Sequence, residues 1–365
     1  MNKSSVLTLP RGPIMADVAA FTLTEEERQR LRHPAIGGVI LFRRNYQSRS
    51  QITALVKEIK ALRSPELVVA VDHEGGRVQR FIAEFTRLPA MRTLGQYWDH
   101  YGAAQAICLA EKVGWVLATE LRACGIDLSF TPVLDLDWHS SGVIGNRSFH
   151  VQATIVSALA IALQQGLNKG GMAACGKHFP GHGFAHGDSH MTLPQDERSW
   201  SQIWKDDLQP FKQLIQSGMA AVMPAHVVYP EIDPAEPAGF SSIWLKQILR
   251  EKMQFKGVIF SDDLTMEGAS IAGDIRARAT RAFAAGCDIA LVCNKPHWVD
   301  TLIDSFNWPE NDQLARRWEM ISGRGIATDF QAQLHTMEFQ QAQQQVSCLA
   351  TAKDLENGIK VGEAF

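Results

Sequence analysis

The chain has 365 residues, of which 45% are hydrophobic and 21% are charged, a composition typical of an ordered globular protein with a large core. Its 36 Lys and Arg residues nearly balance 39 Asp and Glu residues, so the formal net charge of -3 provides no basic field for nucleic acid or an anionic membrane surface. Large-scale disorder is excluded, and we expect a small, nearly neutral ligand instead of a nucleic-acid or membrane partner.

Short apolar runs alternate with longer amphipathic stretches along most of the chain. The apolar runs lack polar alternation, which predicts strands covered on both faces. The predicted strands are 14–18, 38–42, 67–71, 126–131, 172–177, 220–223, 257–261 and 288–292. The predicted helices are 24–32, 51–62, 104–123, 154–167, 204–216, 242–253, 276–285 and 297–305. Eight strand–helix units close a parallel barrel, so the predicted fold class is α/β, a single-domain (β/α)8 TIM barrel.

Local signals support several of these helices. Thr24 lies three residues before Glu27, which is the spacing of a capping box. Ser242 is placed to begin the helix that follows it. Apolar residues recur at steps of three and four in the helix 104–123, as expected for one buried face. They are Ile107, Ala110, Val113, Leu117 and Leu121.

A Gln-rich tail follows Trp308 and Pro309. Its composition leaves two interpretations open, a helical elaboration packed on the barrel or a loose terminus. We therefore expect a catalytic barrel domain over residues 1–308 and a C-terminal helical extension or tail over residues 309–365.

The termini and the cysteines indicate the compartment. The amino terminus has no apolar stretch long enough for a signal peptide, and no run approaches the length of a membrane span, so we expect a cytoplasmic protein. The six cysteines are scattered and form no Cys-x-x-Cys pair, which predicts buried, reduced thiols. They are Cys108, Cys124, Cys175, Cys287, Cys293 and Cys348.

Polar residues stand where the predicted strands end. Asp72 ends the third strand, Lys177 and His178 end the fifth, and Asp262 ends the seventh, while Arg147 follows the fourth. The carboxyl ends of the strands are where a barrel enzyme keeps its chemistry. We expect these side chains to share one rim.

Five strings that include these residues resemble the retaining β-N-acetylglucosaminidases of glycoside hydrolase family 3, in particular the single-domain cytoplasmic enzymes of Gram-negative peptidoglycan recycling. The resemblance extends from about Ala16 to Cys293, with His73 where Gln is often expected. The strings are Val71-Asp72-His73-Glu74-Gly75-Gly76-Arg77-Val78-Gln79-Arg80, Gly145-Asn146-Arg147-Ser148-Phe149, Lys177-His178-Phe179-Pro180-Gly181-His182-Gly183, Asp188-Ser189-His190 and Ser261-Asp262-Asp263-Leu264.

The resemblance implies glycoside hydrolysis with retention, in which a carboxylate attacks the anomeric carbon and a proton donor assists the leaving oxygen. It implies Asp262 as the nucleophile and His190 as the acid/base, oriented by Asp188. An imidazole titrates near neutrality, and an adjacent carboxylate favours its proton-donating form. Glycines around the histidine predict a mobile catalytic loop. The alternative for Asp262 or Asp263 is a helix cap, and we assign to Asp263 either this role or that of supporting the cavity residues from behind.

Charged side chains form the stronger hydrogen bonds and can fix one orientation of a sugar ring. The candidates for binding the sugar are Asp72, Arg80, Arg147, Lys177 and His178. Arg80 has an alternative place in an amphipathic loop, paired with Glu74 or Glu84. For Asp135 and Asp137 we favour a structural role, holding loops through backbone hydrogen bonds.

Histidines at 178, 182, 186 and 190 would line one face of a helix and resemble a metal site. Pro180 and the nearby glycines argue against a helix there. We expect no metal and no cofactor, but a metal-dependent barrel hydrolase that uses His178, His182, His186 and His190 is kept as a rival.

Three functions remain in competition. The first is an exo-β-N-acetylglucosaminidase that acts as a monomer and removes terminal N-acetylglucosamine from peptidoglycan fragments such as anhydro-muropeptides. The second is a phosphorylase or transglycosidase of the same family, because an imidazole acid/base would tolerate an anionic acceptor. The third is a catalytically silent barrel that binds sugar as a sensor or scaffold.

Overall fold

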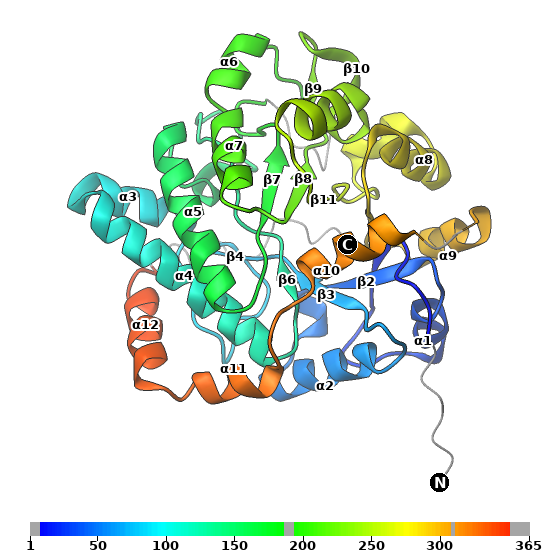
Figure 1. Cartoon of the computed structure of the whole chain (residues 1–365), viewed down its shortest axis with the longest axis horizontal. Coiled ribbons are helices and arrows are strands. Elements are labelled where there is room, and N and C mark those ends of the chain that lie inside the picture. Colours follow the sequence, from blue (N-terminus) through cyan, green and yellow to red (C-terminus); the bar gives the residue numbers. More distant parts are fainter. Residues whose placement is uncertain (1–7, 186–192, 308–310, 351–365) are drawn as a thin grey trace.

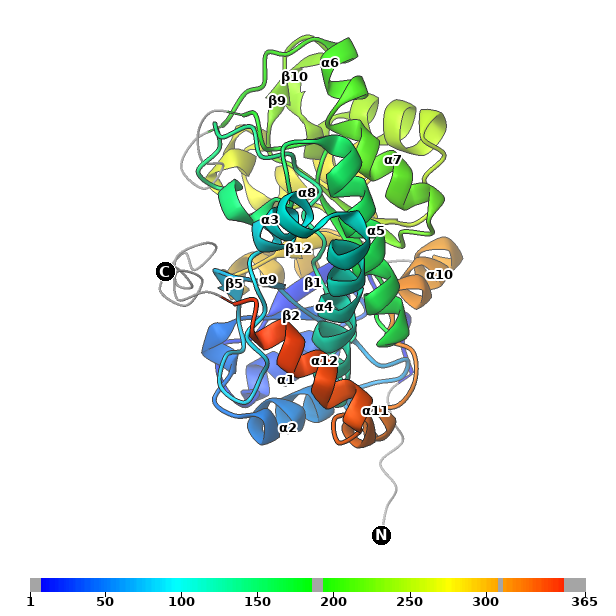
Figure 2. The ribbon, with the colours of Figure 1, turned by 90° about the vertical axis from the view of Figure 1, so that its left-hand side faces the viewer.

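The computed structural model describes residues 8–185, 193–307 and 311–350 (Figures 1 and 2). The fold is α/β, with parallel strands inside and helices around them (Figure 1). One parallel sheet has the order β12 (Ala290–Val292), β1 (Ile14–Asp17), β2 (Ile36–Leu41), β3 (Val68–Val71), β6 (Leu128–Ser129). The second has the order β11 (Val258–Ile259), β8 (Ala221–Pro224), β7 (Cys175–Phe179). All eight predicted strands are therefore confirmed.

Single parallel bridges join the two sheets at both edges. Leu128 of β6 pairs with Ala173, just before β7, and Phe260, just after β11, pairs with Ile289, just before β12. The eight strands thus follow one another without a free edge between the two sheets.

Alternate residues of the strands face two different cores. In β3, Val69 and Val71 belong to the large core shared with the helices, whereas Val68 and Ala70 belong to a smaller core. Each of the eight strands or its immediate flank contributes to the smaller core, through Met15, Ile40, Val68, Leu128, Cys175, Ala221, Phe260 and Leu291. Both faces of each strand are covered, which is why the strands read as unbroken apolar runs.

Most helices lie where they were predicted. They are α1 (Glu25–Leu31), α2 (Arg49–Lys60), α4 (Ala103–Ala123), α5 (Ala153–Lys169), α7 (Leu208–Gln216), α8 (Ile275–Ala285), α9 (Pro296–Ser305) and the helix Ile243–Lys252. Short helical turns lie at Arg43–Asn45, Gly145–Arg147, Ala238–Phe240 and Glu267–Ala272. The predicted helix 204–216 is wrong in its extent, because α6 (Trp200–Lys205) ends before α7 begins. At this break the Asp207 carboxylate accepts hydrogen bonds from Arg198 and Trp138.

Three further features were not predicted. Helix α3 (Met91–Tyr101) precedes α4. Two antiparallel hairpins each follow a strand of the parallel sheets. The first pairs β4 (His73–Gly75) with β5 (Val78–Gln79) after β3. The second pairs β9 (Val228–Tyr229) with β10 (Asp233–Pro237) after β8. The first hairpin matters for function because it carries residues of the candidate site.

Both helix-start predictions are confirmed in position. The Thr24 hydroxyl accepts a hydrogen bond from Glu27 N at 3.2 Å, and Glu27 Oε2 accepts one from Thr24 N at 2.8 Å. Ser242 directly precedes the helix Ile243–Lys252, as predicted, but its side chain makes no capping hydrogen bond. Ser241 Oγ accepts from Trp244 N at 3.2 Å instead. Asp233 orients the Ser241 side chain, since Asp233 Oδ2 accepts a hydrogen bond from Ser241 Oγ at 2.6 Å.

The described part of the C-terminal region is helical. It forms α10 (Asp312–Ile321), α11 (Ala327–Gln333) and α12 (Met337–Ser347). In α10 the buried Trp318 joins the smaller core and donates from Nε1 to Gly12 O at 3.0 Å. A Cβ on Gly37 would lie 2.4 Å from the Trp318 ring, so β2 needs a glycine at this close contact. Helix α12 packs along α4 (Figure 2), with the Phe339 and Trp115 rings 5.4 Å apart.

All six cysteines are free thiols, and four of them are buried as predicted. The prediction of burial is wrong for Cys108 and Cys348, which are exposed, because one lies on an outer face of α4 and the other follows the last turn of α12.

None of the helices in the described ranges is both long enough and apolar enough to span a lipid bilayer.

We predict that Trp318→Ala destabilises the protein by about 3–5 kcal/mol, because it empties a fully buried site between α10 and the strands. Thermal unfolding followed by circular dichroism measures the effect. Met320→Ala is the control, since Met320 lies on the same helix and is 44% exposed. Equal unfolding temperatures for the two variants would contradict the role given to α10.

Candidate active site

A cavity of about 360 Å³ lies at the carboxyl ends of the strands. Six of the eight predicted site residues line it: Asp72, Arg80, Arg147, Lys177, His178 and Asp262. The other two, Asp188 and His190, lie outside the described residues. The structure thus brings together side chains that are as much as 190 positions apart in the numbering, from Asp72 to Asp262.

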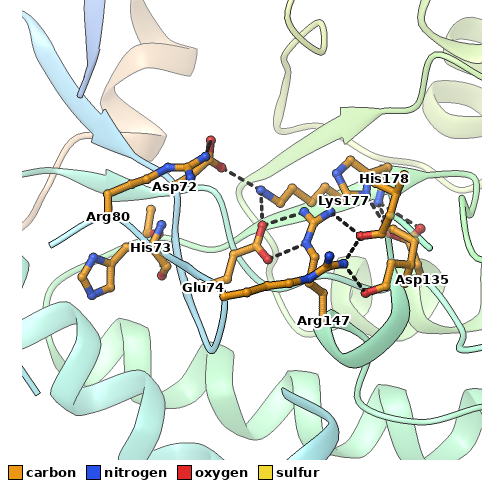
Figure 3. A network of polar contacts seen from close by, with 12 residues as sticks. Asp72, His73, Glu74, Arg80, Asp135, Arg147, Lys177 and His178 are labelled. Atoms are coloured by element: carbon orange, nitrogen blue, oxygen red, sulfur yellow. Dashed lines mark hydrogen bonds and ion pairs between the residues drawn. The ribbon is translucent and has the colours of Figure 1, made fainter. Parts of the chain in front are cut away.

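A buried ion-pair network forms one wall of this cavity (Figure 3). Arg147 donates to Glu74 twice, from Nε to Oε2 at 2.9 Å and from Nη2 to Oε1 at 2.8 Å. Lys177 Nζ lies 2.6 Å from Glu74 Oε1 and 2.8 Å from Asp72 Oδ1. Glu74 is therefore the centre of the network, and it ties the loop after β6 to β7 and to the β4–β5 hairpin.

The network keeps its members charged in spite of burial. Burial acts to raise the pKa of Glu74, but the charges of Arg147 and Lys177 outweigh it and hold that pKa well below its usual range. Burial acts to lower the pKa of Lys177, but Asp72 and Glu74 raise it overall. Glu74 and Asp72 thus face Arg147 and Lys177 next to the cavity, and a third cation, Arg80, lies 3.7 Å from Asp72.

Glu74 was not among the predicted site residues. A signal for it is present in the sequence, because side chains two positions apart in an extended segment share a face, and Glu74 stands two positions after Asp72. The alternative partners proposed for Arg80 are wrong. Glu74 pairs with Arg147 and Lys177, Glu84 accepts from Arg49 N, and Arg80 Nη2 lies 3.7 Å from Asp72 Oδ2.

His73, where Gln was expected, points away from the cavity (Figure 3). Its ring lies 5.9 Å from the Phe81 ring and 5.8 Å from the Phe85 ring. Burial, helped by the charge of Arg80, lowers the pKa of His73 to about 3, so the side chain is a neutral member of an aromatic cluster. The departure from the expected residue therefore leaves the cavity wall unchanged.

Asp135 holds His178 from behind. Its Oδ2 lies 2.7 Å from His178 Nδ1, and its carboxylate also accepts from the backbone N of His178 at 3.2 Å and of His182 at 2.7 Å. Asp137 Oδ1 accepts from His139 N at 3.1 Å. The structural role favoured for these two aspartates is confirmed, and Asp135 in addition fixes the orientation of the His178 ring.

Asp262 and Asp263 are adjacent but differently engaged. Asp262 lines the cavity, and its Oδ1 accepts from Asp263 N at 2.8 Å. Asp263 accepts from Thr265 N at 2.9 Å, from Thr265 Oγ1 at 2.8 Å and from Cys293 N at 3.2 Å. Asp263 does not cap a helix, because the short helix Glu267–Ala272 begins after Met266 and has no side-chain cap. Its supporting role is confirmed by these contacts, which tie the loop after β11 to the end of β12.

Within the described ranges, no three or more His, Cys, Asp and Glu side chains are grouped closely enough to hold a metal ion. His178 and His182 do not lie on a helix, because β7 extends to Phe179, and their ring centroids are 5.9 Å apart. Burial lowers the pKa of His182 to about 4. The other two histidines of the rival metal site, His186 and His190, lie outside the described residues.

Known proteins resemble the chain over nearly its whole length. The family model "Glycosyl hydrolase family 3 N terminal domain" matches residues 7–316. A beta-hexosaminidase from Neisseria meningitidis is 63% identical over 361 residues, which cover 99% of this chain and all of that relative. Crystal structures of NagZ from Neisseria gonorrhoeae superpose with a TM-score of 0.91 and cover 95% of this chain and 100% of that protein. One contains N-trifluoroacetyl-D-glucosamine, at 62% identity, and another a zinc ion, at 61%.

We predict that Glu74→Gln destabilises the protein at pH 7 by about 3–5 kcal/mol, because it leaves buried Arg147 and Lys177 without their shared anion. The folded-state pKa of Glu74 lies below the unfolded value, so its stabilising charge is lost as the pH falls toward the folded pKa. The difference between the variant and the native chain should therefore be largest near neutrality and shrink below about pH 4.3, the unfolded glutamate value.

Urea unfolding at several pH values measures this difference. Glu251→Gln, which removes an exposed carboxylate, is the control and should leave the unfolding midpoint unchanged. A pH-independent difference for Glu74→Gln would show that the charge of Glu74 is not what stabilises the site.

Proposed function

Because the chain belongs to glycosyl hydrolase family 3 and is a glycoside hydrolase of the beta-hexosaminidase type, we propose that it is a retaining exo-β-N-acetylglucosaminidase. Its substrates would be peptidoglycan fragments such as anhydro-muropeptides, from which it removes the non-reducing terminal N-acetylglucosamine. The observation that carries the proposal is the cavity that Asp262 lines together with a network of charged hydrogen-bonding groups.

In the proposed reaction Asp262 is the nucleophile. Its carboxylate attacks the anomeric carbon while His190, oriented by Asp188, protonates the departing glycosidic oxygen, and a glycosyl-enzyme forms. His190 then takes a proton from water, which attacks the same carbon and releases the sugar with its original configuration. Asp262 suits this role because it lies at a strand end and its neighbour Asp263 takes the structural contacts of the loop.

The sugar would be held by Asp72, Arg80, Arg147, Lys177 and His178. Lys177 and Asp72 are hydrogen-bonded to each other at the cavity, so together they offer a donor and an acceptor to neighbouring hydroxyls. His178 has its Nδ1 occupied by Asp135, which leaves Nε2 for the ligand. Arg147 uses Nε and Nη2 for Glu74, so we assign it mainly to holding the network in place.

The parallel bridges at both sheet edges support a closed (β/α)8 barrel over residues 1–308, with a C-terminal extension over residues 309–365 that includes α10, α11 and α12. We propose that the enzyme works in the cytoplasm as a monomer without a cofactor.

Two rival activities have specific support. An imidazole acid/base would admit phosphate as the acceptor in place of water, which would make the enzyme a phosphorylase. A related NagZ structure contains a zinc ion, which keeps a metal-dependent hydrolase in consideration.

An assay of aryl glycosides separates these activities. We predict hydrolysis of aryl β-N-acetylglucosaminide far faster than of the matching β-glucoside, with an unchanged rate after exhaustive chelation and with free sugar as the product in the presence or absence of phosphate. A rate abolished by the chelator would favour the metal-dependent mechanism. A sugar phosphate as the main product would identify a phosphorylase.

We predict that Asp262→Ala nearly abolishes turnover, because no other carboxylate is assigned to attack the anomeric carbon. Glu267→Gln is the matched control, since Glu267 is an exposed carboxylate that lines the same cavity, and its activity should stay near that of the native enzyme. Mass spectrometry after trapping with an activated 2-fluoro sugar should find the adduct on Asp262. An adduct on another residue would overturn the assignment.

A further inference from the structure

The segment 186–192, which carries Asp188 and His190, lies outside the described residues, but the chain on both sides of it is firmly held. On the upstream side, Tyr229 Oη donates to Gly181 O at 2.6 Å. Ser140 Oγ lies 3.0 Å from Gly183 O and 3.1 Å from Phe184 O, and donates to these carbonyls. A Cβ on Gly183 would lie 1.8 Å from Leu136 O, so only glycine allows this close approach.

The downstream side is held by β9. Val228 N donates to Pro194 O at 3.0 Å, and Asp196 N donates to Val228 O at 2.9 Å. Helix α6 follows directly, and Figures 1 and 2 both show α6, β9 and β10 together at one end of the molecule. Tyr229 also belongs to β9, so both ends of the segment are attached to the same strand.

Arg198 contacts both of these ends. On the downstream side its Nε and Nη2 donate to the Asp196 carboxylate at 2.9 Å and 2.6 Å. On the upstream side its guanidinium lies over the Phe184 ring, 4.3 Å from the centroid. Its Nη1 donates to Asp207 Oδ2 at 2.7 Å, which anchors both ends to the junction of α6 and α7.

The residues packed around the Arg198 guanidinium hold it in one position. Arg198 is only 8% exposed, and it lies 5.0 Å from the centroid of the Trp138 ring. Trp138 Nε1 donates to Asp207 Oδ1 at 3.0 Å, so the same carboxylate fixes both partners. A planar cation can stack on an aromatic ring and bind two carboxylates at once, whereas a lysine ammonium lacks this geometry.

We propose that Arg198 is a positioning residue for proton transfer: by joining Phe184 to Asp196 it sets where the segment that carries His190 leaves and rejoins the fold. Arg198 is not among the residues that line the cavity, so it acts through His190 and not on the sugar. The inference rests on the proposed function, because it needs His190 to be the acid/base.

The test compares Arg198→Ala and Arg198→Lys with His190→Ala on aryl β-N-acetylglucosaminides whose leaving groups range from acidic to weakly acidic phenols. A leaving group that departs easily needs little proton assistance, so a displaced His190 should matter least there. General acid–base groups contribute typically about a hundredfold to ten-thousandfold. For Arg198→Ala we expect a smaller loss of kcat/KM, on the order of tenfold to a hundredfold, for the poorest leaving group and a loss of less than about threefold for the best.

Arg250→Lys is the matched control. Arg250 is also largely buried, pairs with Asp288 at 2.7 Å and lies over the Phe255 ring at 5.2 Å, and it has no contact with either end of the segment. If Arg198→Ala fails to fold, Arg198→Lys, which keeps the charge but not the planar fork, provides the comparison.

Losses at Arg198 that grow with leaving-group pKa, as for His190→Ala, support the inference. A loss of kcat/KM at Arg198 that is equal for all leaving groups, or that Arg250→Lys reproduces, overturns the inference. The proposed function still stands in that case, provided that the loss for His190→Ala depends on the leaving group. If His190→Ala itself shows no dependence on the leaving group, the acid role of His190 fails, and the inference fails with it.

Discussion

The interaction on which the site depends is the buried contact of one carboxylate, Glu74, with two cations. Glu74 lies on the hairpin after β3, Arg147 in the turn after β6 and Lys177 on β7, so a single carboxylate links three segments that the sequence keeps far apart. Its contacts are short and bidentate, which compensates for the unfavourable burial of charge. Removing Glu74 would leave Arg147 without its carboxylate partner, and Lys177 would keep only Asp72.

The strands supply a rigid base for this network. Their side chains alternate between a large outer core and a smaller inner one, and α10 adds Trp318 to the inner core. Polar groups are therefore left to the strand ends and to the loops that follow them. Lys177 and Asp262 reach the cavity from strand regions, while Asp135 fixes His178 and Asp263 fixes the turn beside Asp262. His178 and Asp262 thus each have a neighbouring aspartate that makes structural contacts beside the cavity.

The sequence predicts most strands and helices because strands covered on both faces appear as unbroken apolar runs, and helices show apolar residues at helical spacing. It does not predict the β4–β5 hairpin, because strands of three and two residues are too short to show a pattern. The break between α6 and α7 depends on Asp207 meeting Arg198 and Trp138, and the cap at Ser241 depends on Asp233. These partners become neighbours only in the folded chain, as Glu74 does with Arg147, so local patterns could not identify them.

The proposed activity requires that one cavity orients a terminal N-acetylglucosamine between the charged network and Asp262. The most direct measurement is a crystal structure of the Asp262→Ala variant soaked with an aryl β-N-acetylglucosaminide. The account predicts a sugar whose hydroxyls contact Asp72, Lys177 and His178, with the anomeric carbon facing position 262. A sugar bound in another part of the molecule, or held in this cavity with the anomeric carbon turned away from position 262, would contradict it.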